Sequence, residues 1–158
     1  MDQVLALMGK YFALFGLEGD KALTPSMINN YVKMGVLPPP VKKKYSREHL
    51  AHLFIICMLK PVLPLQGISV LIKTQLRQKS VDSLFDRLSA AYEDIFAREM
   101  KEYSELFDRL ASGESDITCA AAMFAFKTAA VSNYGRIFAE RAVFALDQAF
   151  PPEEEKNK

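Results

Sequence analysis

The sequence predicts an all-α protein, with a small N-terminal domain of short helices followed by a C-terminal helical hairpin or bundle. Apolar residues recur at spacings of three and four along almost the whole 158-residue chain, which is the pattern of amphipathic helices. Prolines and glycines interrupt this pattern at a few places, where helices must end. Apart from a short extended stretch at 41–45, no segment suggests a strand.

These interruptions divide the chain. We expect one domain over residues 1–79, a second over residues 80–150, and a disordered acidic tail over residues 151–158. The first helix has apolar residues at Val4, Leu5, Met8, Phe12 and Phe15, and Gly16 and Gly19 mark its end.

The next helix has signals at both ends. Thr24 is a suitable N-cap, and Pro25 fits the first helical position, where a missing N–H costs nothing. The helix should run from Pro25 to Met34 and stop at Gly35, which takes a left-handed conformation. Ile28, Tyr31 and Val32 should face the core.

Three prolines then keep the chain extended, and Val41–Tyr45 is short and basic. Ser46 caps a helix that has Glu48 and His49 in its first turn, and Pro61 and Pro64 end that helix. A further helix is expected over residues 65–78. Its inward residues should be Ile68, Leu71, Ile72 and Leu76.

The C-terminal half should form an antiparallel hairpin. Ser80 caps a long helix that reaches Leu110, the turn covers Ala111–Ser115, and Asp116 or Thr118 opens a last helix that ends near Ala149. The last helix is apolar on more than one face, so one hairpin partner cannot cover it. Either the N-terminal domain or a second subunit must do so, and we favour a homodimer formed through the C-terminal helices.

Aromatic residues in the two C-terminal helices also recur at helical spacing. They are Tyr92, Phe96, Tyr103, Phe124, Tyr134 and Phe138. Such a stripe is more typical of a packed core than of an effector pocket, and we interpret it as core.

Charge is distributed unevenly along the chain. The net charge is only +1, yet residues 21–79 contain ten basic residues and one acidic residue. The residues before this window carry −2 and those after it −6. A basic block beside acidic ones is expected where one part of a protein meets phosphate, although a solvated basic face would have the same composition.

The order of elements from Thr24 to Lys73 resembles the MerR family of winged helix-turn-helix regulators. Gly35, Val36, Leu37, Pro38 and Pro39 match the family's stop after the recognition helix. Tyr45, Ser46, Glu48 and Leu50 match the start of the helix after the wing, and Gln66, Gly67, Ile68 and Leu71 match the helix that follows. The sequence around NNYVK, KKKYS and ICMLK also resembles an uncharacterised bacterial family, domain of unknown function 1836.

The resemblance implies a bacterial transcription regulator that binds double-stranded DNA as a homodimer. Candidate DNA contacts are Ser26, Asn29, Asn30 and Lys33 on the first helix of the motif and Lys42, Lys43, Lys44, Tyr45 and Arg47 on and after the wing. In the MerR pattern an Arg-Tyr-Tyr triplet stands where this chain has Asn29, Asn30 and Tyr31. The alternative is therefore a protein-interaction module that retains the winged fold without DNA binding.

Other classes of function lack support in the sequence. We expect no enzyme, because there is no glycine-rich phosphate loop, nucleophile elbow or triad, and no cofactor. His49 and His52 should be a partly exposed pair without a metal, since no further ligand is near. Cys57 and Cys119 should be buried, reduced thiols. We expect no membrane segment and a cytoplasmic location, because prolines and charges interrupt the strongest apolar run.

Overall fold

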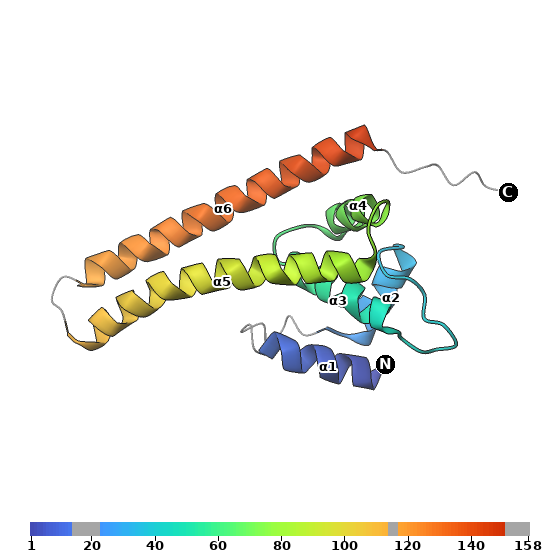
Figure 1. Cartoon of the computed structure of the whole chain (residues 1–158), viewed down its shortest axis with the longest axis horizontal. Coiled ribbons are helices and arrows are strands. Elements are labelled where there is room, and N and C mark those ends of the chain that lie inside the picture. The colour runs from blue at the N-terminus through green and yellow to red at the C-terminus, as the bar shows by residue number, and fades with distance from the viewer. Residues whose placement is uncertain (14–22, 114–116, 151–158) are drawn as a thin grey trace. The chain divides into compact units, whose positions relative to one another are not determined.

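The computed structural model describes residues 1–13, 23–113 and 117–150. These residues form six helices (Figure 1): α1 (Asp2–Ala13), α2 (Pro25–Lys33), α3 (Arg47–Leu59), α4 (Leu65–Leu76), α5 (Val81–Ala111) and α6 (Ile117–Ala149). The described part of the chain contains no strand, and its only β-type pairing is an isolated bridge between Val41 and Lys44. The all-α class is confirmed.

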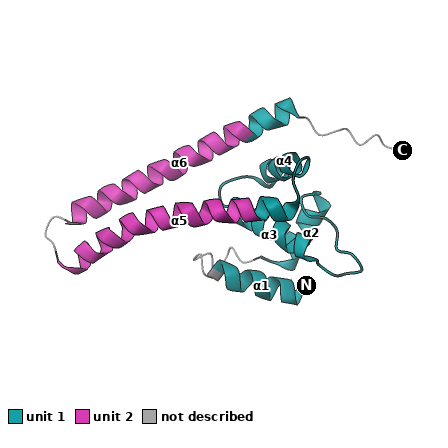
Figure 2. Cartoon of the chain, viewed as in Figure 1, with its two compact units in different colours: residues 1–85, 143–158 teal, residues 86–142 magenta. Residues whose placement is uncertain are grey.

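The chain divides into two compact units (Figure 2). Unit 1 contains residues 1–85 and 143–158, and unit 2 contains residues 86–142. The first residues of α5 and the last residues of α6 therefore belong with the N-terminal helices. The expected disordered tail at 151–158 lies outside the described residues, as do the expected helix end at Gly16–Gly19 and residues 114–115 of the expected turn before α6.

Helix α3 is the central helix of unit 1. It is apolar around most of its circumference, and Leu53, Ile55 and Ile56 are almost fully buried, as expected for a helix covered on several sides. The Phe54 ring contacts the rings of Tyr11 and Phe12 in α1, at 5.2 and 5.8 Å between centroids, and the ring of Phe85 in α5 at 5.7 Å. Buried residues of α1, α2 and α4 also belong to this core, among them Met8, Ile28, Ile68 and Ile72.

The C-terminal end of α6 packs on α4 within unit 1. A Cβ atom placed on Gly67 would lie 3.3 Å from Val143 Cγ1, so glycine permits a close approach at this point. Further along, the Arg77 guanidinium lies 5.2 Å from the centre of the Phe150 ring. Packing by the N-terminal helices, one of the two alternatives for covering α6, is therefore present at its last residues.

In unit 2, α5 and α6 run antiparallel and form the expected hairpin (Figure 2). The Tyr103 and Phe124 rings approach to 6.4 Å, and Lys127 Nζ donates to Glu102 Oε1 at 2.8 Å. The turn begins at the end of α5, where Gly113 has a φ of +73°, a conformation that glycine adopts without steric cost.

Several details differ from the sequence expectation. Helix α4 ends at Leu76 rather than at 78, and Leu76 is exposed instead of facing inward, because it lies in the last turn, beyond the packed part of the helix. Helix α6 begins at Ile117, directly after Asp116, which is one of its two expected starts. Cys57 is half-buried and Cys119 is exposed, so the expectation of two buried thiols is wrong for Cys119. It lies in the first turn of α6.

The aromatic stripe is not a core in the single chain. The exposed fractions are 59% for Phe96, 46% for Tyr103, 61% for Tyr134 and 63% for Phe138. A two-helix hairpin has only one internal face, so side chains on its other faces stay open to solvent. The interpretation of this stripe as core therefore fails for these four residues within one copy of unit 2, whereas Tyr92 and Phe124 are half-buried.

Candidate nucleic-acid interface

Helix α2 is bounded by the two signals that the sequence contains. At its start, Met27 N–H donates to Thr24 Oγ1 at 3.2 Å, and Pro25 occupies the first turn. At its end, Gly35 has a φ of +65°. Gly35 N–H donates to the Val32 carbonyl at 3.0 Å, and Val36 N–H donates to the Tyr31 carbonyl at 3.0 Å. These two bonds form a Schellman motif, which turns the chain sharply after α2.

One face of α2 is buried and the opposite face is polar. Ile28 and Tyr31 are almost fully buried, as expected, while Val32 is half-buried. The predicted contact residues of this helix are all exposed; they are Ser26, Asn29, Asn30 and Lys33. Their spacing of three and four residues places them on one side of the helix. The structure therefore brings this half of the predicted set together.

A polar contact fixes α2 against the end of α3. Lys60 Nζ donates to Tyr31 Oη at 3.1 Å and lies 5.3 Å from the centre of the Tyr31 ring. The buried phenol thus has both a hydrogen-bond partner and a cation over its face. Because Lys60 is the C-cap of α3, this contact holds the orientation of α2 relative to α3 and so the direction of its polar face.

The predicted wing is a two-residue turn, which we call the lysine turn (Val41–Lys44). Val41 N–H donates to the Lys44 carbonyl at 3.1 Å, and Lys44 N–H donates to the Val41 carbonyl at 2.9 Å. The two central residues, Lys42 and Lys43, have φ values of +50° and +63°. Both values are those of a type I′ turn, which favours Asn and Gly. All three lysines are exposed at this turn.

Lysine at both central positions is conformationally costly. A side chain in the left-handed region costs about 1–2 kcal/mol per residue relative to the right-handed one. Strained backbone of this kind persists only where the surroundings hold it, and it is frequent at functional sites. The lysine turn therefore has lysine at two positions whose backbone conformation favours Asn and Gly.

His49 joins the two ends of this segment. Its Nδ1 accepts a hydrogen bond from Ser46 N–H at 3.1 Å and lies 2.7 Å from Ser46 Oγ, while its Nε2 lies 3.1 Å from the Pro39 carbonyl oxygen. The Tyr45 ring packs edge-on against the imidazole at 5.5 Å. His49 thus takes the place that Glu or Gln has in a capping box.

The expectation that His49 and His52 are partly exposed is wrong, because each is only 5% exposed. The His52 Nδ1 lies 2.9 Å from the Glu48 carbonyl oxygen. Both rings are thus held by backbone groups of unit 1. Within the described residues no group of His, Cys, Asp or Glu has the arrangement of a metal site.

Three predicted contact residues have structural partners. The Asn30 Nδ2 donates to Met34 Sδ at 3.6 Å. Tyr45 is half-buried against His49. The Arg47 Nε lies 3.7 Å from Asp82 Oδ1 at the start of α5, although the Arg47 side chain is 82% exposed. An ion pair so open to solvent contributes little to stability, so Arg47 remains accessible to a phosphate.

Sequence reasoning missed the role of His49. Its position three residues after Ser46 was a signal for the capping half of that role, since this spacing defines a capping box. The contact with Pro39 joins residues ten apart in the chain, and no local pattern indicates it. The same holds for the ion pair between Arg47 and Asp82.

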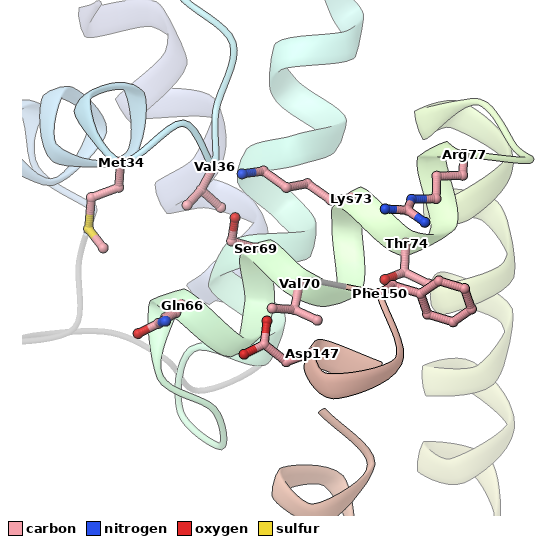
Figure 3. Close-up of a pocket in the computed structure, with 10 residues that line it drawn as sticks. All are labelled: Met34, Val36, Gln66, Ser69, Val70, Lys73, Thr74, Arg77, Asp147 and Phe150. Atoms are coloured by element: carbon pink, nitrogen blue, oxygen red, sulfur yellow. The ribbon is translucent and has the colours of Figure 1, made fainter. Parts of the chain in front are cut away.

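A cavity of about 240 Å³ opens in unit 1 between the turn after α2, helix α4 and the end of α6 (Figure 3). Lys73 extends toward Val36, and the Arg77 guanidinium faces the Phe150 ring. Asp147 also lines the cavity, so its walls carry charges of both signs. Lys73 and Arg77 are exposed and add to the positive charge of unit 1.

The described structure defines a class of protein: a small all-helical unit that displays a polar helix face and a basic turn, joined to a helical hairpin. Residues 1–95, more than half of the chain, match the model of the family described as Domain of unknown function (DUF1836), and the protein belongs to this family. No curated protein and no solved structure matches the chain. None of the described helices is long and apolar enough to cross a membrane.

Proposed function

We propose that unit 1 binds double-stranded DNA as a MerR-like winged helix-turn-helix and that the protein is a bacterial transcription regulator. In this proposal the polar face of α2 enters the major groove, and the lysine turn contacts the flanking backbone. The observation that carries the proposal is the exposed lysine turn, which holds three cations on a backbone conformation that costs energy.

Charge distribution supports the same proposal. Residues 21–79 contain ten basic residues and a single acidic residue, Glu48. The described side chains of Lys33, of the lysine turn and of Arg47 are exposed, so their charge is available to a polyanion. Phosphate contacts dominate the affinity of proteins for DNA, and a basic surface beside a polar helix is their usual footprint.

The test compares two triple variants of the full chain in binding to double-stranded DNA fragments at low salt. The variant K42A/K43A/K44A removes three positive charges from the lysine turn, and R87A/K101A/R141A removes three exposed charges from α5 and α6. We expect the first variant to bind at least tenfold more weakly and the second to bind as the wild type does. Equal weakening by both would show that only net charge matters, and would contradict the proposal.

The alternative function is a protein-interaction module that retains the fold without binding DNA. It is favoured by Asn29 and Asn30, which stand on the exposed face of α2 where the MerR pattern has Arg and Tyr. Uncharged amides give a weaker hold on phosphate than a guanidinium. A wild-type chain that binds no DNA at low salt, and whose triple lysine variant behaves identically, would favour this alternative.

The proposed regulator is a homodimer formed through unit 2. The exposed large apolar residues of this unit include Phe96, Phe107, Met123, Phe126, Val131, Tyr134 and Phe138, each 56–72% exposed. An aromatic side chain has about 150–250 Å² to bury, so these residues alone expose roughly 700–900 Å². A stable dimer buries about 800 Å² per partner, so the exposed apolar area of unit 2 is large enough for such an interface. A second copy packed on these residues would cover this area.

A further inference from the structure

The cavity of unit 1 is lined mainly by one side of α4 (Figure 3). Ile68 and Ile72 are buried and face the core of unit 1 from the opposite side of this helix. The residues of α4 that line the cavity recur at spacings of three and four, which places them in a single stripe; they are Gln66, Ser69, Val70, Lys73, Thr74 and Arg77. The stripe thus carries an amide, two hydroxyls and two cations on a face that the core does not use.

The walls of the cavity offer charges of both signs to a ligand. Lys73 of α4 supplies an ammonium that extends toward Val36, and Asp147 of α6 supplies a half-buried carboxylate. Among the described residues, neither of these two side chains makes an ion pair. The second cation of the stripe, Arg77, lies over the Phe150 ring at 5.2 Å. One cation and one carboxylate, from two different helices, are therefore open to the cavity.

The remaining wall of the cavity is apolar. Met34 and Val36 line it from the end of α2, and Val70 lines it from α4. The cavity volume is about 240 Å³, which is below the roughly 300–1,000 Å³ of pockets for drug-sized ligands. A small molecule with one apolar part fits this space.

The geometry points to a binding site for a small zwitterion with an apolar side chain, which is the chemistry of an α-amino acid. Lys73 binds the carboxylate of the ligand, Asp147 binds its ammonium, and its side chain lies against Val36 and Val70. A simple organic anion is repelled by Asp147, and a simple amine is repelled by Lys73 and by Arg77. A ligand with both charges is attracted by both walls.

The same cavity touches the end of α2. Met34 is the C-cap of this helix, and its Sδ accepts a hydrogen bond from Asn30 Nδ2 at 3.6 Å. A ligand that packs against Met34 therefore contacts the residue that holds the Asn30 amide on the polar face of α2. Ligand binding should change the presentation of that face, and this regulatory part of the inference rests on the proposed DNA binding.

The experiment titrates the full chain with L-leucine and L-phenylalanine at millimolar concentrations and follows the backbone amides by NMR. Each amino acid is compared with two analogues that lack one charge. L-Leucinol and L-phenylalaninol keep the ammonium, whereas 4-methylpentanoate and 3-phenylpropanoate keep the carboxylate. We expect at least one of the two amino acids to shift the amides of Val36, Ser69 and Lys73, and both of its analogues to bind at least tenfold more weakly.

Two outcomes of these titrations would overturn the inference. One is that neither amino acid shifts the amides of the cavity. The other is that an analogue binds as tightly as its parent, because the site would then recognise a single charge. Both outcomes are read on the wild-type chain, so they do not depend on the folding of a variant.

Two variants assign the charges to their residues. In K73M the amino acid should bind no more tightly than its amino alcohol, and in D147N no more tightly than its carboxylic acid. The controls K79M and D86N remove the same charges from exposed residues that do not line the cavity, and they should bind the amino acid as the wild type does. Equal weakening by a variant and its control would contradict the assignment.

DNA affinity with and without the amino acid distinguishes this inference from the proposed function. We expect the amino acid to change DNA affinity by about fivefold or more, which is the lower end of typical coupling between two sites. Amino-acid binding by a chain that binds no DNA would support the site and end the proposed function. DNA binding that a saturating amino acid leaves unchanged would overturn the coupling to α2 and leave the proposed function intact.

Discussion

At the scale of single residues, some structural roles follow from the local sequence, and others depend on the tertiary fold. Thr24, Pro25, Gly35 and Ser46 are recognisable in the sequence because each acts on its immediate neighbours, and the structure confirms their capping roles. The two histidines and Cys119 were misjudged. Their exposure depends on which helices cover them, and that is a property of the tertiary fold.

Cys57 permits a prediction about chemical reactivity. Burial raises the pKa of its thiol to about 11 from an ordinary 9, and the nearby charge of Lys60 only partly offsets this. Two pKa units reduce the thiolate at pH 8 about a hundredfold. We therefore expect Cys57 to react with iodoacetamide at least a hundredfold more slowly in the folded chain than in urea, while exposed Cys119 changes little. Mass spectrometry of the modified peptides measures both rates.

The same shift has a consequence for stability. The folded state favours the neutral thiol. Its contribution to the free energy of unfolding is therefore fully present below pH 9 and is lost as the pH rises from 9 toward 11. Rapid alkylation of folded Cys57 at pH 8 would contradict the burial of this side chain.

At the scale of elements, the helices were easier to predict than the turn between them. Helices α2 to α5 begin where a cap or a proline stands in the sequence, within one or two residues. The basic segment at 41–45 was expected to be extended, and the structure shows a bridge closed by two residues in the left-handed region. Lysine does not indicate such a turn, because its intrinsic preference is against it.

The backbone strain of the lysine turn can be tested by substitution. Replacing its centre by the preferred pair, K42N/K43G, should stabilise the folded chain by about 1 kcal/mol, since the relief of backbone strain exceeds the extra entropy of glycine in the unfolded chain. Urea denaturation followed by circular dichroism measures this. The control K42A/K43A removes the same charges and keeps β-carbons, so it should not stabilise. Equal stabilisation by both pairs would mean that charge repulsion, and not backbone strain, is relieved.

At the scale of the whole molecule, the sequence indicated the all-α class and the C-terminal hairpin, because both follow from periodicity and turn residues. The packing of Val143 against Gly67 joins positions far apart in the chain, and nothing local predicts it. The charge asymmetry is a property of the sequence alone. The function of this asymmetry depends on a binding partner. Neither the periodicity of the sequence nor the fold identifies that partner.

The proposed dimer is tested by charges placed on the exposed surface of α6. Phe126 and Phe138 are 72% and 63% exposed in the single chain, so F126D/F138D should leave the hairpin folded while burying two carboxylates in the dimer interface, which is strongly unfavourable. We expect a dimer mass for the wild type and a monomer mass for the variant by light scattering at micromolar concentration. The control F144D changes a phenylalanine of unit 1 that is also exposed, at 67%, and should remain dimeric. A monomeric wild type would contradict the dimer.

The most direct test of the central claim, that the lysine turn contacts the DNA backbone, is the salt dependence of DNA binding. The slope of log affinity against log salt changes by about 0.9 for each phosphate contact. If all three lysines of the turn contact phosphates, the slope for K42A/K43A/K44A should be smaller than that of the wild type by about two to three, and the slope for R87A/K101A/R141A should be unchanged. Identical slopes for the wild type and the lysine variant would contradict the account.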